Sequence, residues 1–238
     1  MSIEANNDTK TLSEAVANVL REEIIDGRWR PNEKLKTEHL KDRFKVSSAT
    51  VRDALFVLMA EFLVRLEGQK GFRVAPLCLA DAQDLARTRA IVESAALEDS
   101  LRTGGDKWEA LITSEYFLLT KAEERVKLDP TGAIPEYERA NDRFHEALVS
   151  ASSSERLKTM RRTFFQEAKR YRRIVARKAE VMKDDKREHE DLLQACLERD
   201  IERAKRLIVQ HVQNSVAGLT AADFMAAEAE ILDISKAA

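Results

Sequence analysis

Turn-forming residues are scarce in this chain, and that scarcity limits the folds it can adopt. Seven glycines and four prolines stand among 238 residues, far below average usage, so the sequence favours long helices over many tight turns. Aromatic residues make up only 6%, which argues against a large all-β fold. With 44% hydrophobic and 34% charged residues, the composition is that of a soluble globular protein with one large or two small domains.

Cysteine spacing and hydropathy exclude several classes of protein. Cys78 and Cys196 have no CxxC spacing, which excludes a disulfide scaffold and a cysteine-based zinc finger. No apolar run approaches the roughly 18 residues that a membrane span needs, and the N-terminus lacks the pattern of a signal peptide. We therefore expect a cytoplasmic protein with no membrane partner.

Charge is unevenly distributed along the chain, although the net charge of −2 gives no indication of a nucleic-acid partner. Residues 28–73 contain eleven Lys or Arg against six Asp or Glu, so the rest of the chain carries a net −7. Clustered cations are typical of phosphate binding. The pattern indicates a basic region joined to an acidic one, and on charge alone ordinary surface scatter is an equal alternative.

Helices and a hairpin follow one another in the first third of the chain. Apolar spacing predicts a helix over 11–26, ended by Gly27 in the C′ position, and a shorter helix over 37–44. A third helix begins at the serine pair 47–48, either of which can cap it. Alternating apolar residues around a glycine-containing turn predict a β-hairpin over 62–74. This order is that of a winged helix-turn-helix.

We expect the winged helix-turn-helix to span residues 11–77, after a polar, flexible terminus at 1–10, and an all-α domain to span 78–238. The later stretches keep a 3.6-residue apolar period, which predicts a bundle of about six helices and a mainly α fold class. Asp200 is expected to cap the last of them. A final Ala-rich segment, 221–236, is apolar enough to pack or to pair with a partner. The six predicted helices span 81–102, 107–128, 134–151, 155–178, 180–199 and 200–218.

The predicted second helix of the helix-turn-helix carries the candidate DNA-binding residues. Such a helix lies in the major groove with its first residues facing base edges. Arg52 is positioned for a strong contact, either to guanine or to a phosphate. A winged helix used for protein interaction is the alternative. The other candidates are Ser47, Ser48 and Thr50 on the same helix, Thr37 and Lys45 for the DNA backbone, and Lys70 and Arg73 on the wing.

Four stretches of this region carry a family resemblance. Residues 31–35 read PNEKL, 46–55 read VSSATVRDAL, 58–64 read LMAEFLV and 71–74 read GFRV. Together they resemble the GntR family of bacterial transcription regulators, whose usual wording is close to PGxxL, VSRTPVREAL, LxxEGLV and GFxV. The helical remainder resembles the FadR-type effector domain, often called FCD, and six helices resemble its VanR-like branch.

The chain departs from the family wording at several positions. Ser48, Ala49 and Thr50 replace Arg-Thr-Pro, and the arginine usual at the place of Ser48 contacts DNA. The resemblance therefore implies a different operator or weaker DNA binding. Asn32 and Phe62 stand where the family has glycine, which we interpret as tolerable in a turn and after a helix.

Three of the four histidines, His145, His189 and His211, lie in the predicted bundle, and Asn141 shares a helix face with His145 one turn away. Imidazoles that converge from separate helices build metal sites in bundles, and three with an oxygen donor suit Zn, Ni, Mn or Fe. On spacing alone, three unrelated surface or core histidines are the alternative. The resemblance implies one site for a divalent metal (Zn, Ni or Mn), with Asn141 in the usual Asp position as a weaker donor. Asp142, about a hundred degrees round the helix, is the second choice.

Arg89 and Glu93 match the Arg-x-x-Leu-Glu stretch of the family. The resemblance implies that Arg89 faces the pocket, where a guanidinium fork can hold a carboxylate effector. An i,i+4 salt bridge on the helix surface is the alternative.

Residues 156–178 contain ten Lys or Arg. They form either a second nucleic-acid surface or the solvated face of a core helix, and the apolar period favours the latter. One of these arginines can turn into the pocket, although the sequence does not specify which. The predicted buried stripe consists of Leu157, Met160, Phe164, Ala168, Tyr171 and Val175.

Together these features predict a regulator that binds a palindromic DNA operator as a homodimer. The family resemblance implies that it is a repressor, which a small organic acid releases from the operator. A metal-dependent enzyme with an appended winged helix is the first alternative, but no HExxH or HD pair and no nucleophile beside a histidine supports it. A helical domain that serves only dimerisation is the second.

Overall fold

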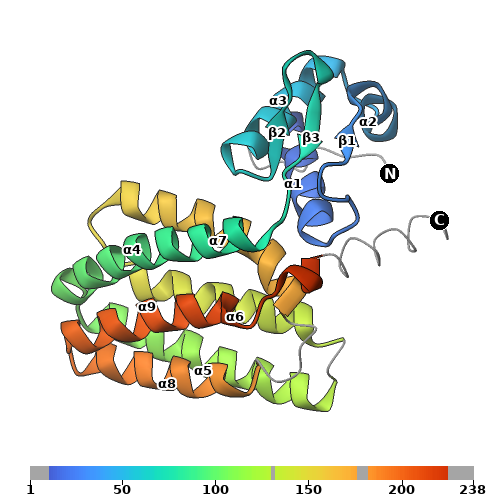
Figure 1. Ribbon diagram of the computed structural model, residues 1–238. Coiled ribbons are helices and arrows are strands. Elements are labelled where there is room, and N and C mark those ends of the chain that lie inside the picture. The colour runs from blue at the N-terminus through green and yellow to red at the C-terminus, as the bar shows by residue number, and fades with distance from the viewer. Residues whose placement is uncertain (1–10, 130–131, 176–181, 225–238) are drawn as a thin grey trace. The chain divides into compact units, whose positions relative to one another are not determined.

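The computed structural model describes residues 11–129, 132–175 and 182–224 (Figure 1). The predicted flexible terminus, the end of the predicted fourth helix of the bundle and residues 225–236 of the Ala-rich segment lie outside these residues. The chain divides into two compact units. One comprises Met1–Ala82, Gln166–Ile174 and Leu219–Ala238, and the other comprises Gln83–Phe165 and Val175–Gly218.

Three helices form the frame of the first unit, as predicted. Helix α1 (Leu12–Ile25) begins at a capping box between Thr11 and Glu14. Helix α2 (Thr37–Phe44) ends at Lys45, which adopts the left-handed conformation. Helix α3 (Ser48–Ala60) is capped by Ser47, whose hydroxyl accepts from the backbone N–H of Thr50. The two predicted helices of the helix-turn-helix are therefore confirmed.

A small antiparallel sheet completes this unit. Strands β2 (Val64–Leu66) and β3 (Phe72–Val74) form the predicted hairpin, with Val64 opposite Val74, around a 3₁₀ turn, η1 (Gly68–Lys70). Strand β1 (Lys34–Leu35) pairs with β3 to give the order β1-β3-β2. The sequence did not predict β1, because two residues are too few to display an alternating pattern.

The core of the first unit joins its helices to the sheet. Leu20 of α1, Leu55 of α3 and Phe72 of β3 belong to one buried cluster. The ring of Phe72 also meets that of Phe56 edge-on at 5.4 Å. Burial of this apolar stripe fixes α3, and with it the exposed first turn that carries the candidate DNA-binding residues.

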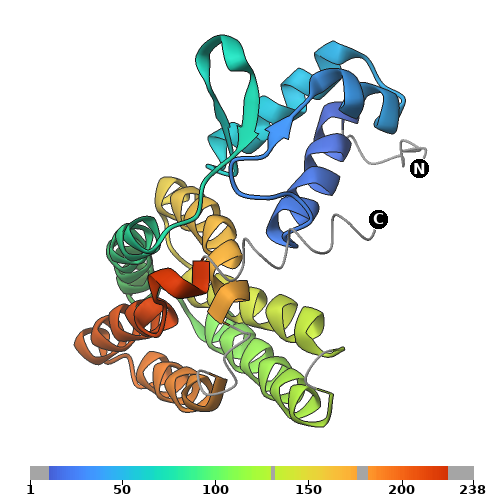
Figure 2. The same ribbon diagram turned by 45° about the vertical axis from the view of Figure 1, so that its right-hand side comes forward.

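Six helices follow, in agreement with the predicted count over the described residues. Helix α5 packs against α6 and α8, and α8 packs against α9 (Figures 1 and 2). Trp108, Phe144 and Leu192 belong to the buried cluster between these helices. Asp200 caps α9 by accepting from the N–H of Arg203, as predicted. The helices are α4 (Leu79–Thr103), α5 (Asp106–Leu128), α6 (Ile134–Val149), α7 (Glu155–Val175), α8 (Met182–Leu197) and α9 (Ile201–Ala217).

The buried face of α7 differs from the predicted one. Met160 is 47% exposed and Phe164 only half-buried, whereas Phe165 is buried together with Ala168 and Tyr171. The predicted stripe was therefore wrong by about one residue in its first half. Two arginines, Arg161 and Arg170, also lie on the buried face, so the basic residues of this helix are not all solvated. Within the described ranges, no helix has the length and apolarity needed to cross a membrane.

Candidate functional site

The first turn of α3 presents polar side chains that are partly engaged with one another. The hydroxyls of Ser47 and Thr50 lie 2.8 Å apart, and Ser48 donates to Glu38 of α2 at 3.2 Å. Arg52 is exposed and forms no hydrogen bond or ion pair with any residue that the structure describes. Its guanidinium is therefore available to an external acceptor.

The predicted wing and backbone contacts fall into two groups. Lys45 and Lys70 are exposed and Thr37 begins α2, so their side chains lie at the surface. Arg73 instead donates to Glu67 at 2.8 Å and to the backbone oxygen of Asn32 at 2.9 Å. Its guanidinium thus ties β3 to the neighbouring turn, which was not anticipated from the sequence.

Three imidazoles converge in the second unit from three helices. His145 lies on α6, His189 on α8 and His211 on α9, and one ligand atom from each lies within 4.8 Å of the others. The ring centroids of His145 and His211 are 4.9 Å apart, and those of His189 and His211 are 4.8 Å apart. His145 and His189 are buried. The three histidines therefore lie together in the fold.

The surroundings of the three rings suit a metal ligand set. Neither ring nitrogen of His145 has a hydrogen-bond partner among the described residues, which is uncommon for a buried polar group. Burial, together with His211 and His189, holds the pKa of His145 well below its usual value, so this ring is neutral, as metal binding requires. Asn141 is buried one turn before His145, while Asp142 is only half-buried.

Arg89 and Glu93 form a buried ion pair beside the histidines. Their exposed fractions are 3% and 2%, and Nε of Arg89 donates to Oε1 of Glu93 at 2.9 Å. Burial opposes ionisation of Glu93, but Arg89 and Arg161 outweigh it, so the pKa of Glu93 lies below its usual value. The i,i+4 pair exists, but it is buried, so the alternative of a pair on the helix surface does not hold.

Arg161 of α7 is the arginine that turns inward. Its guanidinium lies 4.1 Å from the ring centroid of Phe165, and that of Arg89 lies 5.1 Å from the same ring. Phe165 in turn contacts His145, with ring centroids 5.5 Å apart. The sequence indicated that one arginine of this series can turn inward without specifying which, and the i,i+4 spacing of Arg161 with Leu157 and Phe165 was the signal that could have identified it.

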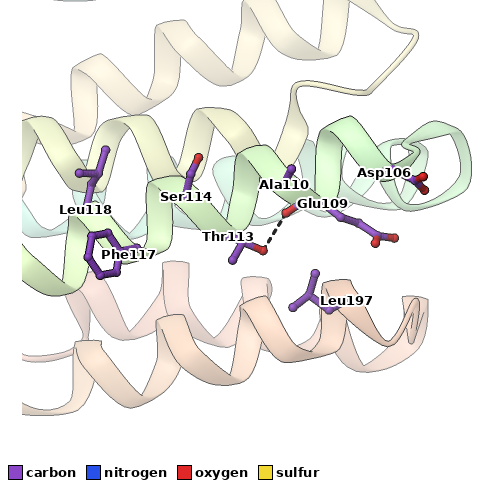
Figure 3. A pocket seen from close by; sticks show the side chains of 8 residues that line it. All are labelled: Asp106, Glu109, Ala110, Thr113, Ser114, Phe117, Leu118 and Leu197. Atoms are coloured by element: carbon purple, nitrogen blue, oxygen red, sulfur yellow. Dashed lines mark hydrogen bonds between the residues drawn. The ribbon is translucent and has the colours of Figure 1, made fainter.

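A second hollow lies on α5 and α8 and shares no residue with the histidine cluster. Figure 3 shows Phe117 and Leu118 toward one end of the hollow on α5, with Leu197 of α8 opposite Thr113 and Glu109. The hydroxyl of Thr113 is already bonded to the backbone oxygen of Glu109. This hollow is open and mainly apolar, and no titratable cluster converges on it, so we assign it no chemistry.

Comparison with known proteins agrees with this architecture. Residues 12–74 match the model of the bacterial regulatory proteins of the gntR family, and residues 84–214 match the FCD domain. The uncharacterized HTH-type transcriptional regulator BphR of Paraburkholderia xenovorans is 38% identical over 88% of this chain and 86% of its own. The HTH-type transcriptional repressor GlaR of Escherichia coli is 33% identical over 84% of this chain and 94% of its own.

Solved structures share the fold. Escherichia coli McbR/YncC superposes with a TM-score of 0.71 at 19% identity, over 88% of this chain and 97% of its own. A GntR regulator from Rhodococcus does so with a TM-score of 0.63 at 24% identity, over 93% and 97%. The matched family and relatives are transcriptional regulators, which removes the enzyme alternative. The chain belongs to the GntR family of bacterial transcription regulators, with a DNA-binding winged helix-turn-helix and an FCD effector domain.

Proposed function

We propose that this regulator is a repressor whose FCD domain binds a divalent transition metal and a small carboxylate effector. The DNA-binding domain then spans residues 11–77, and the effector-binding and dimerisation domain spans 78–238. The observation that carries the proposal is the convergence of three imidazoles from α6, α8 and α9. Burying a cluster of imidazoles costs free energy unless their nitrogens form hydrogen bonds or bind a metal.

The donor set fits a transition metal. His145, His189 and His211 would bind it through nitrogen and Asn141 through its amide oxygen, a set that suits Zn, Ni or Mn. A bound metal would supply Lewis acidity to an oxygen ligand of the effector. His145 can serve because it is buried, neutral and without another partner among the described residues.

The charge near the cluster favours an anionic effector. Arg89 of α4 and Arg161 of α7 both lie beside the ring of Phe165, and both lower the pKa of Glu93. A guanidinium binds a carboxylate bidentately. Arg161 also forms an ion pair with the partly exposed Glu146, so an anionic effector would compete with Glu146 for this guanidinium. We therefore assign Arg89 and Glu93 to the effector pocket, with Arg161 as an added member.

The winged helix binds the DNA operator. In a dimer, two such domains read two half-sites of a palindromic operator, with Arg52 contacting a base or phosphate and Ser47, Ser48, Thr50, Thr37, Lys45 and Lys70 supporting it. Effector binding shifts DNA affinity only to the extent that the two dimer arrangements bind effector unequally. Repression is supported by the name of the relative GlaR, a transcriptional repressor.

Metal content tests the proposal directly. The full chain is purified, stripped with a chelator and dialysed against Zn²⁺, Ni²⁺ or Mn²⁺ before elemental analysis, beside His189→Ala and the control His39→Ala. His39 is exposed on α2, so its loss should leave metal content unchanged. About one metal per chain, lost only in His189→Ala, is expected. Absence of metal in the wild type would refute the metal site.

A further inference from the structure

The carboxyl group of Glu123 is buried beside the histidine cluster and poorly compensated. Glu123 lies on α5 with its side chain 9% exposed, and neither oxygen forms a hydrogen bond with any described residue. Its Oε1 atom lies 3.5 Å from Nδ1 of His189. Burying a carboxylate with so little compensation is costly, so the positive charge that balances it has to be found nearby.

Two of the three imidazoles have a carboxylate behind the same ring atom. Nδ1 of His211 lies 2.7 Å from Oε2 of Glu188, and Nδ1 of His189 faces Glu123. A carboxylate at Nδ1 favours a proton on that nitrogen, which leaves the lone pair on Nε2. This arrangement orients metal-binding histidines and increases their basicity. Glu188 lies at hydrogen-bond distance from its ring, whereas Glu123 lies at ion-pair distance from Nδ1 of His189.

The candidate ligand set itself carries no negative charge. Three neutral imidazoles and the amide of Asn141 would face a dication, since the carboxylate usual at that position is missing. Glu123 is not one of the residues whose ligand atoms cluster, so it sits behind His189 rather than in the set. Its negative charge can stabilise a bound cation by making the imidazole of His189 a stronger donor.

We propose, building on the metal site above, that Glu123 is a positioning residue for that site. It orients His189 with Nε2 available to the metal, and together with Glu188 behind His211 it supplies the negative charge that Asn141 does not. The site thus takes its compensating carboxylates from α5 and α8 instead of α6.

The test compares Glu123→Gln with Glu124→Gln in the full chain. Glu124 is the exposed neighbour on α5 and pairs with Lys121, so it controls for loss of a charge on the same helix. Each protein is stripped and titrated with Zn²⁺ alone in competition with a chromophoric chelator. We expect zinc affinity to fall 10- to 100-fold in Glu123→Gln and to stay unchanged in Glu124→Gln.

The metal-free melting temperature separates positioning from a merely structural pair. Glu123→Gln should melt at or above the wild-type temperature without metal, because an uncompensated buried charge has been removed. A lower metal-free melting temperature with unchanged zinc affinity would overturn the inference. In the zinc-loaded wild type, ¹⁵N spectra should report the proton of His189 on Nδ1. Asn141→Asp in the Glu123→Gln background should recover at least tenfold of the lost affinity.

These outcomes distinguish the inference from the proposed function. If the wild type binds no zinc, the metal site itself fails, and the inference fails with it. If the wild type binds zinc and Glu123→Gln binds it equally, only the role of Glu123 is refuted.

Discussion

Replacing Glu93 by Gln removes one charge from a buried pair while keeping its shape. Both Arg89 and Glu93 are almost fully buried, and the pair is joined through Nε and a second guanidinium nitrogen at 2.9 and 2.8 Å. Breaking such a pair strands a buried charge and costs about 3–5 kcal/mol. Because Gln still offers one acceptor to Arg89, the lower end applies. We expect the free energy of unfolding to fall by about 3 kcal/mol.

That loss corresponds to a melting temperature lower by about 10 °C for a unit of this size. Unfolding in guanidinium chloride is followed by tryptophan fluorescence. A Trp29→Phe background leaves Trp108, which is buried in the second unit, as the reporter. The control is Glu98→Gln on the same helix. Glu98 pairs with Arg102 and Lys205 at the surface, where ion pairs contribute little, so its shift should be much smaller.

The comparison has a clear negative outcome. If Glu93→Gln loses under about 1 kcal/mol, or no more than Glu98→Gln, then the pair is not buried as described. The positive charge assigned to Arg89 and Arg161 would then be accessible to water, and the electrostatic argument for an anionic effector would lose its basis.

Three further predictions concern other parts of the chain. Arg52→Ala should weaken binding to an operator selected from random duplexes by about 10- to 100-fold, measured by fluorescence anisotropy, whereas Lys70→Ala should mainly reduce the salt dependence. Burial and Asp81 raise the pKa of Glu167 to about 7, so the folded state binds its proton more tightly than the unfolded state. Stability should therefore fall as pH rises from about 5 through about 7, and Glu167→Gln should flatten this slope in melting curves. Phe62 has a φ of 59°, so Phe62→Gly should raise stability by about 1 kcal/mol in denaturant titrations; a loss would show that its ring contributes more than the strain costs.

Local signals in the sequence were sufficient for the framework. Capping serines and aspartates, helical periodicity and a glycine turn predicted α2, the Ser47 cap and the hairpin, because each depends on neighbours within a few residues. Strand β1 was missed because its partner β3 is distant in the sequence. On α7 the period alone did not decide between Phe164 and Phe165, since adjacent positions on a long basic helix differ only by what packs against them.

The candidate site was predictable in its histidines and in the Arg89–Glu93 pair, but not in Glu123 or Arg161. His145, His189 and His211 stood out as rare residues on predicted helices, and Asn141 through its spacing. Glu123 and Arg161 belong to abundant residue types whose default location is the surface, so only tertiary packing distinguishes them from their neighbours.

The buried charges of the site imply that metal and effector binding are coupled. Arg89 and Arg161 face Glu93 and Glu146, and a bound dication would add positive charge beside them. A carboxylate effector that binds next to this dication would be attracted by it, so each should bind more tightly in the presence of the other, by the same factor. The coupling should also be larger in the Glu123→Gln variant. Glu123→Gln weakens the metal but leaves more positive charge for an anion, so the dependence of effector affinity on zinc should increase in that protein.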